Sequence, residues 1–405
     1  MRYPDINGNL IAFVYAGDIW TVNATGGTAK RVTSHPGIEL FPKISPDGKW
    51  IAFSAEYSGS RQIWGMPSEG GTARQLTFYN SVGEMPPRGG FDNVVLDWTP
   101  DSKRILFRAN RTSFGDRNGC YFTVGIDGGF EEPLPIVNGG FAAFSPDGSQ
   151  LCFTPVDREF RTWKRYKGGR ATELWTYDLA NNRSKQITQW AGSDQWPVWH
   201  DNYIFYASDR DTRLNIWRYN VDTGNNEQIT RHADFDVMWP SGRNGKLVYE
   251  KGGYLHVLDL ASGDSKKISV AIRYDNPNLQ PYFRNVKEFI AGHSLSPSGK
   301  RALFEARGDI YSVPVEKGEI QNLTNTQGVR EISPVWSPDG KQIAYYSDAT
   351  GEYELYLLEN REGATPRQIT HGSSAWKHAA EWSPRSTHLV YSDRTMKLWL
   401  VDIAS

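Results

Sequence analysis

A short turn followed by an apolar run recurs nine times along the chain, and no other feature restricts the possible folds as strongly. Four copies are nearly alike: SPDGKWIAF at residue 45, SPDGSQLCF at 145, SPSGKRALF at 296 and SPDGKQIAY at 337. Five weaker copies complete the set: NGNLIAFV, TPDSKRILF, HDNYIFY, GRNGKLVY and SPRSTHLVY. Eight steps separate the first copy, at residue 8, from the last, at residue 386, so the average period is about 47 residues.

Each repeat has the composition of four short strands. A segment with proline near its start (FPKI, WPVW, SPVW) leads into the turn, and an apolar strand, an IW-type strand and a strand ending in QLT or QIT follow. In SPDG, proline presets φ for a type I turn and glycine supplies the left-handed position after it. β-Branched and aromatic residues dominate between the turns. A repeat of this length and content predicts an all-β chain folded as β-propeller blades.

One aromatic position recurs in the third predicted strand of most repeats. We expect its residues to be core side chains between neighbouring sheets, because large aromatic rings dominate such cores. The set is Trp20, Trp64, Trp175, Trp217 and Trp399, with Tyr311 and Tyr356 in the same place.

Nine blades exceed the usual four to eight of one propeller, so the chain must be divided. The longest interruption, residues 271–291, has two prolines and no clear turn signal. We therefore expect a six-bladed propeller at 1–270, a linker at 271–291, and the first three blades of a second, incomplete propeller at 292–405. The ninth repeat stops before its QIT strand, as a fragment of a longer polypeptide would. An eight-bladed ring with one stray blade is the rival division, and it does not explain the interruption.

The composition narrows the possible functions. Lysine and arginine total 45 and aspartate and glutamate 46, a formal net charge of -1, which argues against a nucleic-acid partner. The chain has no apolar run of about 18 residues, so we expect no membrane partner. It also has no GxSxG elbow, no HExxH pattern and no phosphate-binding glycine loop. We therefore expect no catalytic residues, no cofactor and no metal. The compartment stays open: cytoplasmic with a native start, periplasmic or exported if a signal peptide was removed.

Two loops depart from the repeat. FYNSVGEMPPRGGFDN, residues 78–93, joins the second and third repeats, and DREFRTWKRYKGGRATE, residues 157–173, interrupts the fourth. The second loop interleaves arginines and lysines with three aromatic residues. Such a segment can bind a peptide carboxylate or an acidic surface through charge-assisted hydrogen bonds. The segment can equally be a solvent-exposed loop whose aromatic residues only cover the surface of the blade.

Three segments resemble the amino-terminal part of the tricorn protease family. They are YPDINGNLIAFVYAGDIW at the start, DREFRTWKRYKGGRATELW in the fourth repeat and LFEARGDIYSVPVEKGEIQNLTNTQGVRE after the interruption. The likeness covers the whole chain. In that family a six-bladed propeller precedes a seven-bladed one, a PDZ domain and a serine peptidase core. The resemblance implies that this chain is the non-catalytic part of such a hydrolase, with the catalytic residues beyond Ser405.

The resemblance also implies a gating and docking function in proteolysis. A narrow axial channel would admit extended peptides or unfolded polypeptides, and basic loops would hold their carboxylates. The candidate contacts are Arg88, Arg161, Lys164 and Arg165. The implied partners are such peptides, the PDZ and peptidase domains of the same longer chain, and further copies in a homo-oligomer.

Two alternatives stay open. A TolB-like propeller, which also carries SPDGK hairpins, would be a protein-protein interaction scaffold without a protease. A propeller with its own hydrolase or lyase activity would need histidines or carboxylates that converge in one pocket.

Overall fold

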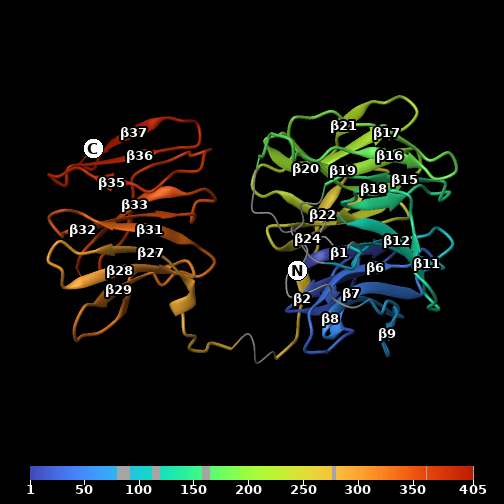
Figure 1. The fold of residues 1–405 in the computed structure, drawn as a ribbon, viewed down its shortest axis with the longest axis horizontal. Coiled ribbons are helices and arrows are strands. Elements are labelled where there is room, and N and C mark those ends of the chain that lie inside the picture. The colour runs from blue at the N-terminus through green and yellow to red at the C-terminus, as the bar shows by residue number, and fades with distance from the viewer. Residues whose placement is uncertain (80–91, 112–118, 157–164, 276–279, 362, 405) are drawn as a thin grey trace. The chain divides into compact units, whose positions relative to one another are not determined.

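The computed structural model describes residues 1–79, 92–111, 119–156, 165–275, 280–361 and 363–404, and almost all of its regular elements are strands (Figure 1). The chain separates into two compact units, Met1–Asp275 (unit 1) and Asn276–Ser405 (unit 2). A single turn of 3-10 helix, η2, covers Lys287–Phe289. Across the described ranges, no helix has the length and apolarity needed to cross a bilayer. The predicted all-β class is confirmed.

Unit 1 contains six four-stranded antiparallel sheets, each formed by consecutive strands. The first strands are β1 Arg2–Asn7, β6 Glu39–Ile44, β10 Val94–Trp98, β14 Ala142–Phe144, β18 Asp194–His200 and β22 Val237–Ser241. The second strands are β2 Leu10–Tyr15, β7 Trp50–Ser58, β11 Arg104–Ala109, β15 Gln150–Phe153, β19 Tyr203–Asp211 and β23 Lys246–Lys251. The third strands are β3 Asp18–Asn23, β8 Ser60–Pro67, β12 Cys120–Gly125, β16 Trp175–Asp178, β20 Arg213–Asn220 and β24 Tyr254–Asp259. The fourth strands are β5 Lys30–Arg31, β9 Arg74–Gln75, β13 Glu132–Pro133, β17 Arg183–Gln186, β21 Asn226–Gln228 and β25 Ser265–Lys267.

The six sheets pack side by side in a closed ring. Each first strand contacts the first strand of the next sheet, and β22 of the sixth sheet contacts β1 of the first. Core side chains fill the spaces between the sheets, so each sheet buries both of its faces against its neighbours.

A short parallel pair ties the end of the ring to its beginning. Strand β26 (Val270–Ala271) forms a separate two-stranded sheet with β4 (Gly27–Thr28), which lies in the chain between the third and fourth strands of the first sheet. Gly26 has φ +92°, and a Cβ atom there would lie 2.4 Å from the carbonyl oxygen of Ser269, so only glycine allows this approach. Beyond β26, the ring of Tyr274 lies 5.5 Å from that of Trp20 and 4.3 Å from the Arg31 guanidinium carbon. The segment that leaves unit 1 is thus held on the first sheet.

The recurring SPDG turn has the predicted geometry. At residues 45–50, the Ser45 hydroxyl donates to Asp47 (2.6 Å) and accepts from the Trp50 amide (3.0 Å). Gly48 has φ +75°, the left-handed position that the turn requires. The serine and aspartate thus satisfy turn groups that the sheet leaves unpaired.

A threonine two residues after the fourth strand has a structural role in six of the sheets; it ends a QLT or QIT segment in four of them, an RVT segment at residue 33 and an NLT segment at residue 324. Its hydroxyl accepts a hydrogen bond of 2.8–3.1 Å from a backbone amide near the start of the third strand. Six threonines make this contact: Thr33, Thr77, Thr188, Thr230, Thr324 and Thr370. Each fourth strand is very short, so this side chain extends the pairing that the strand cannot provide.

Unit 2 contains three consecutive antiparallel sheets. The first comprises β27 Ile290–Leu295, β28 Arg301–Ala306, β29 Asp309–Pro314 and β30 Gln321–Asn322. The second comprises β31 Glu331–Trp336, β32 Gln342–Ser347, β33 Glu354–Glu359 and β34 Arg367–Gln368. The third comprises β35 Glu381–Trp382, β36 His388–Ser392 and β37 Leu398–Asp402. The predicted division into six and three blades joined at 271–291 stays a prediction.

The aromatic position of the third strands is a core position in most sheets. Trp20 is buried, and Trp64, Trp175 and Trp217 are partly buried against core clusters. Tyr311 and Tyr356 are partly buried as well. Trp399 was wrongly predicted to lie in the core, because it is 44% exposed. It lies on β37, the outermost strand of a three-stranded sheet.

Replacement of Thr230 by valine should destabilise unit 1 by about 1–3 kcal/mol. The change removes the acceptor of the Ile216 amide (2.8 Å) and leaves that buried donor unpaired. Chemical denaturation followed by tryptophan fluorescence measures the loss. Thr223→Val is the matched control, because Thr223 is exposed and makes only a 3.4 Å contact with the Asn225 amide. Equal effects of the two changes would contradict the role of the recurring threonine.

Glu39 should make the stability of unit 1 depend on pH. Burial raises the pKa of this carboxyl group from 4.5 to about 7, although Thr33 (2.6 Å), Tyr57 (2.6 Å) and the Ile19 amide (3.1 Å) donate to it. A carboxyl group with a raised pKa in the folded state contributes stability below pH 4.5 that is lost as pH rises through 7. The loss is about 3 kcal/mol. Glu39→Gln should flatten the free energy of unfolding across this interval, and an unchanged profile would rule Glu39 out as its source.

Candidate functional site

The two departing loops leave unit 1 at the same edge of the ring. Residues 78–93 connect β9 to β10, and residues 157–173 connect β15 to β16. In an antiparallel sheet with strands in chain order, the exit from the fourth strand and the turn between the second and third strands share one edge. We call this the loop edge. The SPDG turns lie at the opposite edge, which we call the turn edge.

Only one of the four candidate carboxylate contacts can be placed. Arg88, Arg161 and Lys164 lie outside the described residues. Arg165 is partly buried, and its Nε donates to the carbonyl oxygen of Thr212 (3.1 Å), in the turn between β19 and β20. The part of the insert that leads back to β16 is thus hydrogen-bonded to the fifth sheet. The convergence of these four cationic side chains on one peptide carboxylate stays a prediction.

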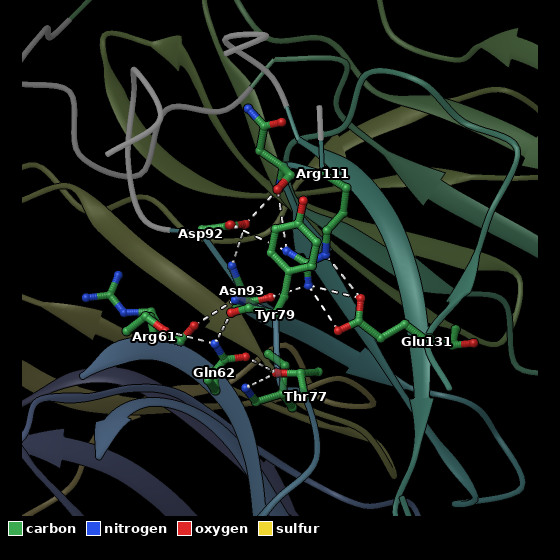
Figure 2. Close-up of polar contacts among 12 residues, drawn as sticks. Arg61, Gln62, Thr77, Tyr79, Asp92, Asn93, Arg111 and Glu131 are labelled. Atoms are coloured by element: carbon green, nitrogen blue, oxygen red, sulfur yellow. Dashed lines mark hydrogen bonds and ion pairs between the residues drawn. The ribbon is translucent and has the colours of Figure 1, made fainter. Parts of the chain in front are cut away.

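Arg111 holds both ends of the 78–93 loop at its base (Figure 2). Its guanidinium lies 3.4 Å from Asp92, 3.0 Å from Glu131 and 2.7 Å from the side-chain oxygen of Asn93. The same group lies 4.2 Å from the ring centre of Tyr79. Tyr79 lies where the chain enters the loop, and Asp92 lies where the chain leaves it. The Arg111 guanidinium therefore contacts both ends of the loop.

A second layer of amide contacts supports this base (Figure 2). The Gln62 side chain donates to the carbonyl oxygen of Tyr79 (2.6 Å) and accepts from the Thr77 hydroxyl (2.7 Å). The Asn93 side chain donates to the carbonyl oxygen of Arg61 (2.7 Å). Burial raises the pKa of Asp92, and the charge of Arg111 counters that rise. These ion pairs and hydrogen bonds attach both ends of the loop to the ring.

The base of the 157–173 insert has a similar composition. Arg210 forms an ion pair with buried Asp194 (2.8 Å), and the Trp190 indole donates to Asp209 (2.7 Å). The Lys167 ammonium and the Arg210 guanidinium lie 5.7 and 5.8 Å from the Trp190 ring. Burial raises the pKa of Asp194, and Arg210 opposes this shift. Basic and aromatic residues are therefore already paired where this loop meets the ring.

Five aromatic side chains occupy the axis of unit 1. Together with Leu96 of β10 and neighbouring residues of the other first strands, they line a cavity to which all six sheets contribute. Neighbouring rings lie 4.4–6.4 Å apart between centres. The set is Tyr3, Phe41, Phe141, Trp196 and Trp239, which we call the axial aromatic cluster. The cavity measures about 30 Å³, room for one or two water molecules. Among the described residues of unit 1, this cavity is too small for an extended peptide, so the expected axial channel is not found there.

Backbone irregularities point these rings inward. Tyr3, Phe41, Trp196 and Trp239 each have φ of 50–55°, and the strand register shifts at each of them. A β-bulge re-aims a side chain in this way. Each of the four residues precedes a proline, a recurrence already visible as FP and WP near the start of the repeats. The prolines near the start of the repeats were part of the predicted pattern, but the pattern did not relate the aromatic residues before them to the axis of the ring.

A second hollow lies on the axis at the turn edge. Its volume is about 270 Å³, and residues from sheets two to six line it, among them Lys43, Asp97 and Arg243. The sequence analysis missed these residues, because they belong to different repeats and none forms a local motif. Within the described ranges, no group of three or more histidine, cysteine, aspartate or glutamate side chains converges as metal ligands would.

Comparison with known proteins identifies the relatives of this architecture. The family model described as the tricorn protease N-terminal beta propeller domain matches residues 1–264. Tricorn protease homolog 1 of Streptomyces coelicolor is 26% identical over 379 residues, which cover 92% of this chain and 34% of that protein. The tricorn protease homolog of Saccharolobus solfataricus is 24% identical over 406 residues, covering 99% of this chain and 36% of that protein.

A solved structure supports the fold. The crystal structure of the tricorn protease matches with a TM-score of 0.61 at 16% identity, over 96% of this chain and 46% of that chain. The chain thus spans about a third of the length of the curated relatives it matches. These matches confirm the β-propeller interpretation and favour the tricorn resemblance over the TolB-like alternative.

Replacement of Arg111 by methionine should destabilise unit 1 by about 1.5–3 kcal/mol, because Asp92 and Glu131 lose their shared cation. Without Arg111, the pKa of Asp92 rises further, so the loss should be larger at pH 8 than at pH 4. Thermal denaturation at the two pH values measures both effects. Arg218→Met, which breaks a more exposed pair with Glu227, should cost less than about 1 kcal/mol. A loss at Arg111 that does not vary with pH would contradict the assigned contact.

Proposed function

Because this chain belongs to the tricorn protease family through its N-terminal β-propeller domain, we propose that it is the non-catalytic, peptide-docking part of a tricorn-like serine protease. The observation that carries the proposal is the match of the family model to residues 1–264, nearly the whole of unit 1. The peptidase that would act on the docked peptides lies outside these residues. We further propose that residues 1–270 form a six-bladed propeller, 271–291 a linker, and 292–405 the first three blades of a second propeller.

The structure favours docking at the loop edge over passage through unit 1. The axial aromatic cluster leaves a cavity of only about 30 Å³, so an extended peptide has no route along this axis. Both the 78–93 loop and the 157–173 loop leave unit 1 at the loop edge. Hydrogen bonds and ion pairs hold the residues at the base of each loop. Arg88, Arg161, Lys164 and Arg165 are the proposed carboxylate contacts on these loops.

The proposed partners follow from the same relationship. Unstructured peptides or unfolded polypeptides are the ligands, and PDZ and peptidase domains of one longer chain are the intramolecular partners. Assembly into a homo-oligomer is proposed for the full-length protein. We assign the proposed gating function to the loops or to the completed second propeller, because the cavity among the axial aromatic residues is only about 30 Å³.

The proposal can be tested with a fluorescent unstructured peptide and the purified 405-residue chain. Fluorescence anisotropy should show binding, and the chain alone should not hydrolyse the peptide. Changing Arg88, Arg161, Lys164 and Arg165 together to glutamine should weaken binding at least tenfold, since one lost charge-assisted hydrogen bond costs about 1.5–3 kcal/mol.

The matched control neutralises four exposed lysines instead, Lys49, Lys103, Lys185 and Lys300, and so removes the same total charge. Its binding should stay within about twofold of the unchanged chain. Equal weakening in both variants would show that only net charge matters. In the full-length enzyme, peptide turnover unaffected by the loop changes would refute the assigned contacts.

A further inference from the structure

The axial pocket at the turn edge of unit 1 is a second candidate binding site. It measures about 270 Å³, and five of the six sheets contribute to its lining. The turn prolines Pro46, Pro100 and Pro146 line it, and Pro100 and Pro146 are exposed. Trp98 and Trp199 add aromatic surface. The pocket thus combines apolar walls with a small polar set, which is the usual composition of a ligand site.

The pocket is closed at its inner end. Lys43, Leu96 and Pro197 line both this pocket and the small cavity of the axial aromatic cluster. The two hollows are therefore neighbours on the axis, and the aromatic rings separate the pocket from the loop edge. A ligand that enters from the turn edge cannot continue through the ring. A pocket that is closed at one end accommodates the terminus of a peptide chain and not an internal segment.

Two cations with further N–H donors line the pocket. The Lys43 ammonium donates to the Ser241 hydroxyl and lies 3.9 Å from the Asp5 carboxylate. Arg243 donates from one terminal nitrogen to Asp97 (2.8 Å). Lysine and arginine have three and five N–H donors, so both keep capacity for an anionic ligand.

Asp5 and Asp97, the carboxylates that contact the two cations, also accept hydrogen bonds from other protein groups. The Ile44 amide (2.7 Å) and the Ser241 hydroxyl donate to Asp5, which is almost fully buried. The Phe144 amide donates to Asp97 (3.0 Å). Burial lowers the pKa of Lys43, whereas the charges of Asp5 and Asp97 act to raise it. The two acids thus favour the charged form of Lys43, while protein donors hold the carboxylate oxygens.

We propose that the axial pocket binds the C-terminal carboxylate of a short peptide, with Lys43 and Arg243 as its cationic contacts. A carboxylate terminus matches the closed inner end, the cations beside it and the apolar walls around the preceding residue. The volume lies just below the usual range of about 300–1,000 Å³ for ligand pockets, so the pocket suits one chain end. Only the choice of a peptide as the bearer of the carboxylate rests on the proposed function.

Paired peptide probes test this proposal on the 405-residue chain. N-acetyl-trialanine with a free carboxylate and its C-terminal amide differ only in the group that Lys43 and Arg243 would bind. Isothermal titration calorimetry should show binding of the acid and at least tenfold weaker binding of the amide. Arg243→Gln should weaken binding of the acid at least tenfold and leave the amide unaffected.

Two changes at exposed pocket residues keep the test valid if Arg243→Gln fails to fold. Asp201 and Asn244 line the pocket, are exposed and have φ of 48° and 55°, a region that both aspartate and asparagine tolerate. Asp201→Asn removes a negative charge and should strengthen binding of the acid about twofold. Asn244→Asp adds one and should weaken it by a similar factor. Neither change should alter binding of the amide.

Each outcome decides the proposal. Preference for the acid together with opposite effects of the two changes supports it. Equal binding of acid and amide, or indifference to both changes, overturns it. Binding of inorganic phosphate without binding of the peptide acid also overturns it and defines an anion site of another kind. The loop substitutions of the proposed function do not touch this pocket, so either proposal can fail alone.

Discussion

Face-to-face packing of each sheet on its neighbours is the interaction on which the rest of unit 1 depends. A single four-stranded sheet has two apolar faces and cannot bury both, so every sheet requires one on each side. Contact between β22 and β1 supplies the last such interface and removes the free ends. The core clusters and the axial residues take their positions from this closed arrangement, because the first strand of every sheet must face the same axis.

The two edges of the ring differ in chemistry as a result. At the loop edge, Arg111 and Arg210 compensate buried acids and support the long connections. At the turn edge, Lys43 and Arg243 lie in a hollow that the short SPDG turns surround. The aromatic residues between the edges separate the two environments. One ring therefore presents two chemically different surfaces.

The sequence was sufficient for the local structure and insufficient for the site. The period of about 47 residues and the SPDG and QIT segments predicted short antiparallel strands, and contacts such as those of Ser45 and Thr230 explain why those segments recur. Trp399 shows the limit of the repeat, since an equivalent position is not equally buried when its sheet lacks a fourth strand. The resemblance led us to expect an open axis, and the repeat could not correct this expectation, because side-chain direction at a bulge cannot be read from the period.

The parallel pair between β26 and β4 has a mechanical consequence. Unit 2 follows unit 1 through the segment after Ala271, and that segment is attached to the first sheet by β26 and by Tyr274. Tension applied through the connection is therefore shared between the first and the sixth sheets of the ring. The parallel pair includes two backbone hydrogen bonds, from the Gly27 amide to Ser269 (2.8 Å) and from the Ala29 amide to Ala271 (2.9 Å), so a force at the junction would act on the beginning of the ring and not on the sixth sheet alone.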